Sequence, residues 1–190
     1  MSKKKLGSKS NLFPYPVTLV GAMVDGKPNF MTIAFIGIVN MNPAMIAMGA
    51  NRGHHTCKGI RDNMAFSVNI PTEKMMEVTD YCGLNSGDKT DKCGLFDVFY
   101  GTLKNAPMIK ECPVNLECKV LQILELGGMD TVFIAQVMES YADEECLTGS
   151  NVDIEKLRPM IFSMYENKYL GIGKYMGKGW SAGKDYKKAK

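Results

Sequence analysis

The chain contains 190 residues, of which 45% are hydrophobic and 23% are charged, a balance typical of a soluble globular protein. This composition excludes a largely disordered chain or a coiled coil, and the length predicts a single domain over residues 1–190 with its core at about 13–174. The net charge is +3, but eight lysines lie near the two ends of the chain, where residues 1–10 and 178–190 are predicted to form basic tails. Those eight are Lys3, Lys4, Lys5, Lys9, Lys184, Lys187, Lys188 and Lys190. Without them, the 23 basic residues fall to 15 against 20 acidic ones, so the body does not suit nucleic-acid binding.

The first half of the chain is predicted to form strands. Residues 15–24 are rich in Val, Leu and Thr and end at an Asp-Gly pair, a strong hairpin signal between two apolar runs. The return run spans residues 30–39, and an Asn-Pro pair turns the chain into a third apolar run at residues 44–50. These segments predict three antiparallel strands in a meander.

Two short helices are predicted after these strands. Thr56 is a suitable N-cap for the first, because its hydroxyl can accept a hydrogen bond from a free backbone N–H of the first turn. That helix should end near residues 61–63, and a strand over residues 64–70 should follow. Thr72 is expected to cap the second helix, which Gly83 should stop.

The second half combines a polar loop with further strands. Residues 85–93 have the composition of a surface loop, and such loops often carry function. Apolar and polar residues then alternate over 114–120, which predicts a half-buried strand, and a Gly-Gly turn leads into a hairpin arm over 131–138. Residues 159–165 are expected to add a strand. The fold class is therefore mainly β with short helices, as an antiparallel barrel decorated by helices.

The cysteines and the apolar runs bear on the cellular compartment. The six cysteines are scattered without a Cys-x-x-Cys pair, and the first residues lack the compact apolar segment of a secretory signal. The longest apolar region, residues 30–50, is interrupted by Asn40, Asn42 and Pro43, so it does not suit a membrane span. We therefore expect a cytoplasmic protein with reduced thiols and no membrane association.

Several familiar motifs for chemistry are nearly present but do not match. Residues 83–90 resemble a P-loop with too short a glycine spacing, and the Gly-Ile-Gly of residues 171–173 lacks the third glycine of a dinucleotide site. His54, His55 and Cys57 lie close together, but a closed zinc site needs four ligands, so no metal is expected. No catalytic triad can be argued from spacing, and a bound cofactor is the more economical carrier of chemistry.

Two segments instead predict an anion site, provided that the fold brings them together. One opens the first helix, whose free N–H groups and dipole favour a phosphate. The other is the polar loop, which offers hydroxyl, backbone and ammonium donors. The residues concerned are Asn51, Arg52, His54, His55 and Thr56 in the first segment and Ser86, Gly87, Lys89 and Lys92 in the second. An ordinary solvated loop is the alternative interpretation.

Further motifs occur in a characteristic order. They are Pro16-Val17-Thr18-Leu19-Val20, Asn29-Phe30-Met31-Thr32-Ile33-Ala34, Asn42-Pro43, Thr56, Phe66-Ser67-Val68-Asn69-Ile70-Pro71, Asp80-Tyr81-Cys82-Gly83, Ser86-Gly87, Asp91-Lys92, Ala106-Pro107-Met108-Ile109, Cys112-Pro113-Val114-Asn115-Leu116-Glu117-Cys118 and Tyr169-Leu170-Gly171. With this order and spacing, the chain resembles the flavin reductase-like, FMN-binding split-barrel family over about residues 13–174. Within that family it is most similar to the flavoredoxins.

The resemblance implies a six-stranded antiparallel Greek-key split β-barrel, a homodimer, and FMN held non-covalently near the dimer interface. It also implies an FMN-dependent oxidoreductase that takes electrons from NAD(P)H or a redox protein, with the chemistry carried by the FMN rather than by a catalytic side chain. By position, the isoalloxazine ring would be faced by Asn29, Met31 and Thr32. The ring and the ribityl chain would lie along Met48, Ala50 and Asn51. The phosphate would be surrounded by His55, Thr56, Ser86, Gly87 and Lys92, beside Arg52 and His54. The phosphate end coincides with the anion site predicted from the residues alone.

Two departures from the family pattern keep alternatives open. Many relatives place an arginine two residues before the threonine, where this chain has His54, and a histidine is only partly charged near neutral pH. Ile36-Gly37 stands where relatives often have aromatic residues, which favours a flavoredoxin-like electron carrier without NAD(P)H activity. A flavin-free ligand-binding barrel is the third hypothesis.

Overall fold

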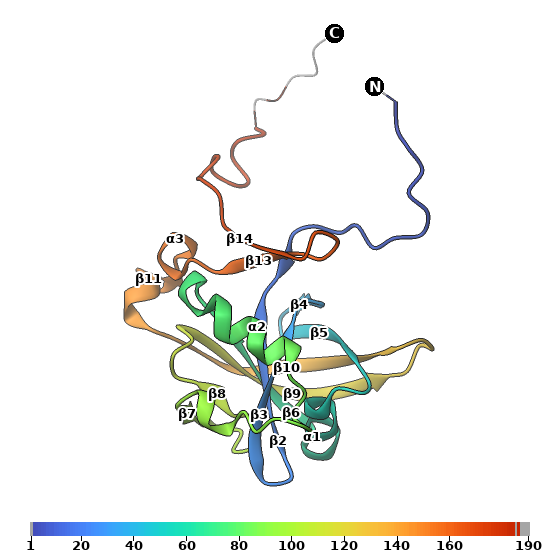
Figure 1. The fold of residues 1–190 in the computed structure, drawn as a ribbon. Coiled ribbons are helices and arrows are strands. Elements are labelled where there is room, and N and C mark those ends of the chain that lie inside the picture. Colours follow the sequence, from blue (N-terminus) through green and yellow to red (C-terminus); the bar gives the residue numbers. More distant parts are fainter. Residues whose placement is uncertain (1, 185, 187–190) are drawn as a thin grey trace.

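A computed structural model describes residues 2–184 and 186, so part of the predicted tail 178–190 lies outside the described residues. The protein is mainly β with short helices, as predicted (Figure 1). Within the described part of the chain, no helix has the length and apolarity needed to cross a membrane.

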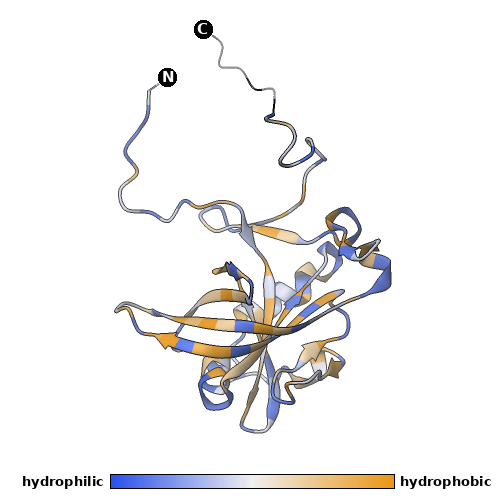
Figure 2. Ribbon diagram, turned by 180° about the vertical axis from the view of Figure 1, so that it is seen from behind, coloured by the Kyte–Doolittle hydropathy of each residue, from blue (hydrophilic) through white to orange (hydrophobic). Residues whose placement is uncertain are grey.

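One antiparallel sheet of seven strands organises the fold, in the order β3-β2-β6-β9-β10-β5-β4. Its strands are β2 (Thr18–Val24), β3 (Lys27–Ile33), β4 (Ile36–Met41), β5 (Ala44–Asn51), β6 (Ala65–Ile70), β9 (Val114–Leu124) and β10 (Asp130–Ala142). Hydrophobic and hydrophilic residues alternate along several of these strands, because successive side chains point to opposite faces (Figure 2). Phe66, Met48 and Phe133 are fully buried and bring β6, β5 and β10 into one hydrophobic core.

The predicted run 30–39 is not one strand of a meander. Its first part belongs to β3, where Ile33 pairs with Thr18, and its second part belongs to β4, where Ile36 pairs with Met48. β3 and β4 therefore lie at opposite edges of the hydrogen-bonded sheet, although only two residues join them. Because three peptide units span at most about 11 Å, the sheet has to curl until these edges approach each other.

This curl brings the sheet towards a barrel, but the expected six-stranded barrel is not confirmed. The sheet has seven strands, and its hydrogen-bonded order is open at β3 and β4. The predicted hairpin of residues 114–120 and 131–138 is confirmed, since β9 and β10 pair in antiparallel register, and both strands are longer than predicted.

Short helices cover part of the sheet, with α1 packed on β2 and α2 packed on β3. The helical segments are α1 (His55–Asn63), η1 (Glu73–Met75), α2 (Met76–Leu84), η2 (Cys93–Leu95), η3 (Glu144–Cys146) and α3 (Ile154–Leu157). Two predicted boundaries are wrong. His54 has an extended backbone and is the N-cap of α1, so Thr56 lies inside the first turn, and Gly83 lies inside α2 rather than beyond its end. Thr72 precedes the 3-10 turn η1, which leads into α2.

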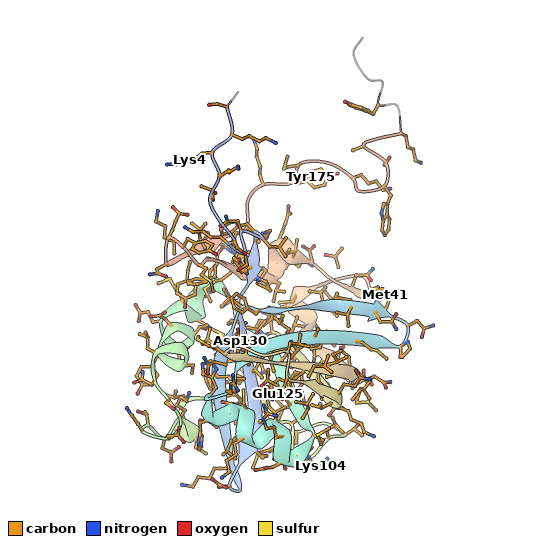
Figure 3. The ribbon with its side chains drawn as sticks, turned by 90° about the vertical axis from the view of Figure 1, so that its right-hand side faces the viewer. Lys4, Met41, Lys104, Glu125, Asp130 and Tyr175 are labelled. Carbon is orange, nitrogen blue, oxygen red and sulfur yellow. The ribbon has the colours of Figure 1, made fainter. Side chains whose placement is uncertain are left out.

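Three small sheets complete the described fold. Their strands are β1 (Tyr15–Pro16) with β13 (Met160–Ser163) and β14 (Lys168–Gly171), β7 (Val98–Phe99) with β8 (Met108–Ile109), and β11 (Leu147–Thr148) with β12 (Asn151–Val152). The strand predicted over 159–165 is confirmed in shorter form as β13, whereas β14 was not predicted. The segments before β1 and after β14 leave the same end of the protein, and Lys4 and Tyr175 lie on them beyond the folded body (Figure 3).

Candidate functional site

Two adjoining cavities lie where β3, α1 and the segment that follows α2 meet. We call them the apolar cavity, of about 360 Å³, and the polar cavity, of about 240 Å³. Thr32, His54 and Gly83 line both cavities, which therefore adjoin at these residues. The apolar cavity is further lined by Val17, Ile33, Ala34, Phe35, Gly49, Ala50, Asn51, Asp80, Asp130, Phe162, Met164 and Tyr169, and the polar cavity by Met31, His55, Thr56, Cys82, Leu84, Asn85, Ser86, Gly87 and Lys92.

The apolar cavity is closed in part by the β13–β14 hairpin. Phe162 and Tyr169 contact each other across that hairpin with ring centroids 5.2 Å apart. The hydroxyl of Tyr169 donates a 2.8 Å hydrogen bond to Oδ1 of Asp80, which ties β14 to α2. Burial, reinforced by this hydrogen bond, raises the pKa of Tyr169 to about 12, so the phenol remains a donor near neutral pH. The cavity offers apolar walls with a few polar groups, which suits a flat aromatic ring.

The polar cavity contains the N-terminus of α1. The N-cap residue His54 makes no side-chain cap hydrogen bond, and the N–H of Cys57 donates to the backbone oxygen of His54 at 2.9 Å. The N–H groups of His55 and Thr56, together with the positive end of the helix dipole, therefore favour an anion. Thr56, in that first turn, is buried, and its hydroxyl accepts a 2.7 Å hydrogen bond from Nδ2 of Asn29 on β3. The hydroxyl proton of Thr56 therefore remains available for a ligand.

Lys92 supplies a buried positive charge to the same cavity. The residue is only 2% exposed, and its ammonium donates to the backbone oxygens of Asn85, at 2.9 Å, and Cys82, at 3.3 Å. An ammonium has three donors, and among the described residues Lys92 forms no ion pair with a carboxylate. Burial lowers the pKa of Lys92, because the charged form is poorly solvated there. A buried cation of this kind is stabilised by an anionic ligand.

Gly87 allows the polar loop to close tightly over β3 and α1. A Cβ at this position would lie 2.6 Å from Oδ1 of Asn29 and 2.6 Å from Cδ2 of His55, so only glycine fits without displacement. The loop thereby brings Ser86 and Lys92 to the N-terminus of α1. Ammonium, hydroxyl and free N–H donors together fit a phosphate group, and the adjoining apolar cavity fits the ring that carries it.

His54 lies where the two cavities adjoin, and its charge state depends on both. Partial burial lowers its pKa from the ordinary 6.5, the carboxylate of Asp130 opposes this shift, and the nearby charge of Lys92 adds to it. The imidazole is therefore mostly neutral at neutral pH in the ligand-free protein. An anion in the polar cavity would favour the protonated form.

Most of the residues predicted for the site are brought together. Eight of them line the polar cavity, namely Met31, Thr32, His54, His55, Thr56, Ser86, Gly87 and Lys92, and Ala50 and Asn51 line the apolar cavity. Asn29 supports the site through its hydrogen bond to Thr56. The two segments that predicted an anion site therefore do meet in space.

Besides Asn29, three predicted residues line neither cavity. Met48 is fully buried in the hydrophobic core, where it pairs across the sheet with Phe133 and Ile36. Arg52 is exposed in the turn after β5, and its charge contributes to lowering the pKa of Glu125. Lys89, part of the predicted anion site, lines a separate surface hollow on the other side of the polar loop.

Several cavity residues were missed by the sequence analysis. Phe162, Met164 and Tyr169 come from the C-terminal hairpin, Asp80 from α2, and Asp130 from the start of β10. They meet only through tertiary structure, so no local pattern marks them as a group. Asp80 and Tyr169 each carried a signal, because both belong to motifs that support the family resemblance.

The cysteines and possible metal ligands add no second reactive centre to this site. All six cysteines are free, and burial raises the pKa of Cys57 and of Cys82 to about 11, which keeps both thiols protonated near neutral pH. In residues 2–184 and 186, no group of three or more His, Cys, Asp or Glu side chains is arranged to hold a metal ion.

Comparison with known proteins supports the resemblance over nearly the whole chain. The family described as flavin reductase like domain matches residues 10–166. The flavoredoxin of Methanosarcina acetivorans is 45% identical with a TM-score of 0.91, over 96% of this chain and 98% of that structure. The flavoredoxin of Desulfovibrio vulgaris (Miyazaki F) is 33% identical with a TM-score of 0.88, over 96% of this chain and 100% of that structure.

A curated relative has a named role in a larger enzyme system. The reductase component of the 4-nitrophenol 4-monooxygenase/4-nitrocatechol 2-monooxygenase of Rhodococcus opacus is 29% identical over 155 residues, which cover 82% of this chain and 78% of that protein. Taken with the match over residues 10–166, these similarities establish that the chain belongs to the flavin reductase-like family. Within this family, its similarity to two flavoredoxins confirms the narrower resemblance.

Proposed function

We propose that this protein binds FMN in the two adjoining cavities and acts as an oxidoreductase that transfers electrons through it. The observation that carries the proposal is the buried ammonium of Lys92, which forms no ion pair with a carboxylate within the described residues and faces the same cavity as the N-terminus of α1. Relatives that are named flavoredoxins and a monooxygenase reductase component support the same class of function.

In this proposal the chain's own residues bind and orient the cofactor. Lys92, Thr56 and the first-turn N–H groups of α1 hold the phosphate, and the loop that contains Ser86 and Gly87 closes over it. The walls of the apolar cavity exclude water from the isoalloxazine ring, and Tyr169 holds the β13–β14 hairpin against α2. Bound FMN would supply the capacity to accept and release electrons.

NAD(P)H or a redox protein is the proposed electron donor, and the structure gives a reason to consider the protein donor. Asp80 and Asp130 place two carboxyl groups at the apolar cavity, where they would disfavour the negatively charged diphosphate of NAD(P)H. The identity to flavoredoxins, 45% and 33%, also exceeds the 29% identity to the monooxygenase reductase component. A flavoredoxin-like carrier without NAD(P)H activity is therefore the second candidate function.

We further propose that the protein is a homodimer with the FMN near the interface. β4 is an edge strand with exposed apolar side chains, since Ile38 is 73% and Met41 is 80% exposed, and Met41 lies at the tip of the β4–β5 hairpin (Figure 3). A hollow of about 490 Å³ beside β4 shares Ala34 and Phe35 with the apolar cavity. Exposed apolar edges of this kind are typical of interaction surfaces.

The proposed compartment is the cytoplasm, with no membrane or nucleic acid as partner. The support comes from the six cysteines, all of which are free and five of which are buried, as expected for a protein folded in a reducing environment.

Anaerobic reconstitution tests this proposal. The purified protein is mixed with FMN, excess flavin is removed, and NADH or NADPH is then added while the visible spectrum is followed. Retained flavin absorbance that NAD(P)H bleaches supports a reductase, whereas retained absorbance that only a reduced redox protein bleaches supports the carrier. A colourless protein after removal of free flavin would contradict both and leave the flavin-free ligand-binding barrel.

A further inference from the structure

Among the described residues, the apolar cavity is lined by one basic side chain, that of His54. The other titratable groups that line it are the carboxyls of Asp80 and Asp130 and the phenol of Tyr169. Lys92, the buried cation of the site, lines the polar cavity and not the apolar one. A negative charge that forms in the apolar cavity therefore meets two carboxyls and a single imidazole.

The acidic groups of this cavity cannot supply a positive charge. The phenol of Tyr169 donates a 2.8 Å hydrogen bond to Oδ1 of Asp80, and burial raises its pKa to about 12, so it does not exchange its proton near neutral pH. Asp130 begins β10 and pairs across the sheet with Asn51, three residues before His54 in the chain. Because the protonated forms of these acids are neutral, His54 is the group of the apolar cavity that can become a cation near neutral pH.

The backbone of His54 is fixed, whereas its imidazole is free to change its charge. The backbone N–H donates to the oxygen of Asn51 at 2.9 Å, and the backbone oxygen accepts from the N–H of Cys57 at 2.9 Å. In the part of the chain that the structure describes, His54 forms no ion pair with a carboxylate, and its side chain makes no capping hydrogen bond. The residue is exposed, so solvent can supply a proton. His55 differs, because its Nδ1 is paired with Oδ1 of Asp88.

We propose that His54 takes up a proton from solvent when the bound flavin is reduced, and thereby becomes the counter-charge of the reduced ring. The inference rests on the proposed function, because it places the isoalloxazine ring in the apolar cavity. Reduction of FMN adds two electrons and one proton to a neutral ring and leaves one negative charge on it near neutral pH. With a second proton on His54, two electrons and two protons enter together, and the net charge of the cavity is unchanged. The electrons come from the proposed donor, NAD(P)H or a reduced redox protein.

The charges around His54 determine the direction of this effect. The titratable groups that line the two cavities with it are Asp80, Asp130 and Tyr169 in the apolar cavity and His55, Cys82 and Lys92 in the polar cavity. Desolvation and the ammonium of Lys92 favour the neutral imidazole, whereas the carboxylate of Asp130 favours the protonated one. The phosphate of FMN would favour the protonated form equally before and after reduction. Only the charge of the ring differs between the two redox states, so a shift between them reports on the ring.

Histidine NMR of the FMN-loaded protein tests this proposal, and the chain contains only two histidines, so the spectrum is simple. The imidazole resonances are titrated from about pH 6 to about pH 9, first in the oxidised protein and then anaerobically after reduction with dithionite. His54→Gln removes one of the two resonances and so assigns both. His55→Gln is the matched control, because it removes the histidine that lines only the polar cavity. FMN is kept at saturating concentration for all three proteins.

Reduction is expected to move the midpoint of the His54 titration about one pH unit higher, a tenfold gain in proton affinity, and to move that of His55 much less. The reduction potential should also fall more steeply above neutral pH in the wild type and in His55→Gln than in His54→Gln, where one proton for two electrons gives about 30 mV per pH unit. An unchanged His54 titration, or shifts of equal size in both histidines, would overturn the proposed proton uptake while the flavin site stands. Failure of the wild type to retain FMN would instead overturn the proposed function.

Discussion

The side-chain amide of Asn29 donates a 2.7 Å hydrogen bond to the hydroxyl of Thr56, and both side chains are buried. This contact joins β3 to the first turn of α1 at the base of the polar cavity. The threonine hydroxyl is the acceptor in this hydrogen bond, so its own proton remains available for donation to a ligand. A threonine that would otherwise be an ordinary first-turn residue thereby becomes a donor towards the proposed phosphate.

Replacement of this hydroxyl should affect binding and stability together. Thr56→Ala is expected to weaken FMN binding by roughly 1.5–3 kcal/mol, because one hydrogen bond to a charged group is lost. It should also lower the free energy of unfolding of the apoprotein by about 1–3 kcal/mol, since the buried amide of Asn29 loses its acceptor. Fluorescence titration and urea denaturation measure the two effects.

Thr56→Ser is the matched control for that substitution. Serine retains the hydroxyl, so FMN affinity should stay close to that of the wild type. Unchanged FMN affinity in Thr56→Ala would remove Thr56 from the cofactor site, whatever the stability result.

FMN affinity should decrease as the pH rises above the ordinary pKa of histidine. Partial burial holds the pKa of His54 below 6.5 in the free protein, and a nearby phosphate would raise it, so the complex binds more protons than the apoprotein. Linkage then requires affinity to fall with rising pH, by at most about tenfold per pH unit. Titrations between about pH 7 and about pH 8 lie above most of the second ionisation of the phosphate itself, whose pKa is about 6.

His54→Gln separates this effect from that of the neighbouring His55. The variant should bind FMN with an affinity that changes little over the same pH range. A wild-type affinity that rises with pH would contradict the assigned role of His54.

The lowered pKa of His54 also predicts how the free energy of unfolding of the apoprotein depends on pH. As the pH falls below 6.5, His54 takes up a proton in the unfolded chain before it does so in the folded one. The free energy of unfolding should therefore decrease as the pH falls through this window, and His54→Gln should reduce the slope. Denaturation series in urea at several pH values measure it, and an identical slope in the variant would exclude this contribution.

Substitution of an exposed residue on β4 should disrupt the proposed dimer. Ile38 is 73% exposed, and Ile38→Glu introduces a charge that a closely packed interface cannot solvate. We expect light scattering to give the mass of a single chain for this variant and twice that mass for the wild type. Ile154→Glu, at a residue that is 56% exposed on α3, should remain dimeric. A monomeric wild type would contradict the dimer.

The sequence predicts those parts of the fold whose signals are local. The Asp-Gly turn locates the β2–β3 hairpin, and alternation over 114–120 locates β9, because turn chemistry and strand period are read from neighbouring residues. The break between Ile33 and Ile36 has no turn residue to mark it, so the run 30–39 looked continuous. The sheet imposes this division, because the first half pairs with β2 as edge strand β3 and the second half pairs with β5 as the opposite edge strand β4.

The residues of the candidate site likewise fall into those that local sequence patterns predict and those that only the tertiary structure brings together. Thr56 and Lys92 were predicted because a helix start and a polar loop are visible as local patterns. Tyr169 and Asp80 are 89 residues apart and meet only through the hydrogen bond between β14 and α2, which no sequence period indicates. Met48 was expected along the ring only from the family resemblance, and the structure places its side chain fully buried in the hydrophobic core.

The central claim, that the polar cavity binds the phosphate of FMN, is tested most directly by comparing FMN with riboflavin, which lacks the phosphate. Both are titrated into the wild type and into Lys92→Met, which keeps an unbranched side chain without the charge. We predict that the wild type binds FMN at least about tenfold more tightly than riboflavin, and that Lys92→Met weakens FMN binding about 10–100-fold with riboflavin binding unchanged. Equal binding of FMN and riboflavin by the wild type, or an equal loss of both in Lys92→Met, would contradict the account.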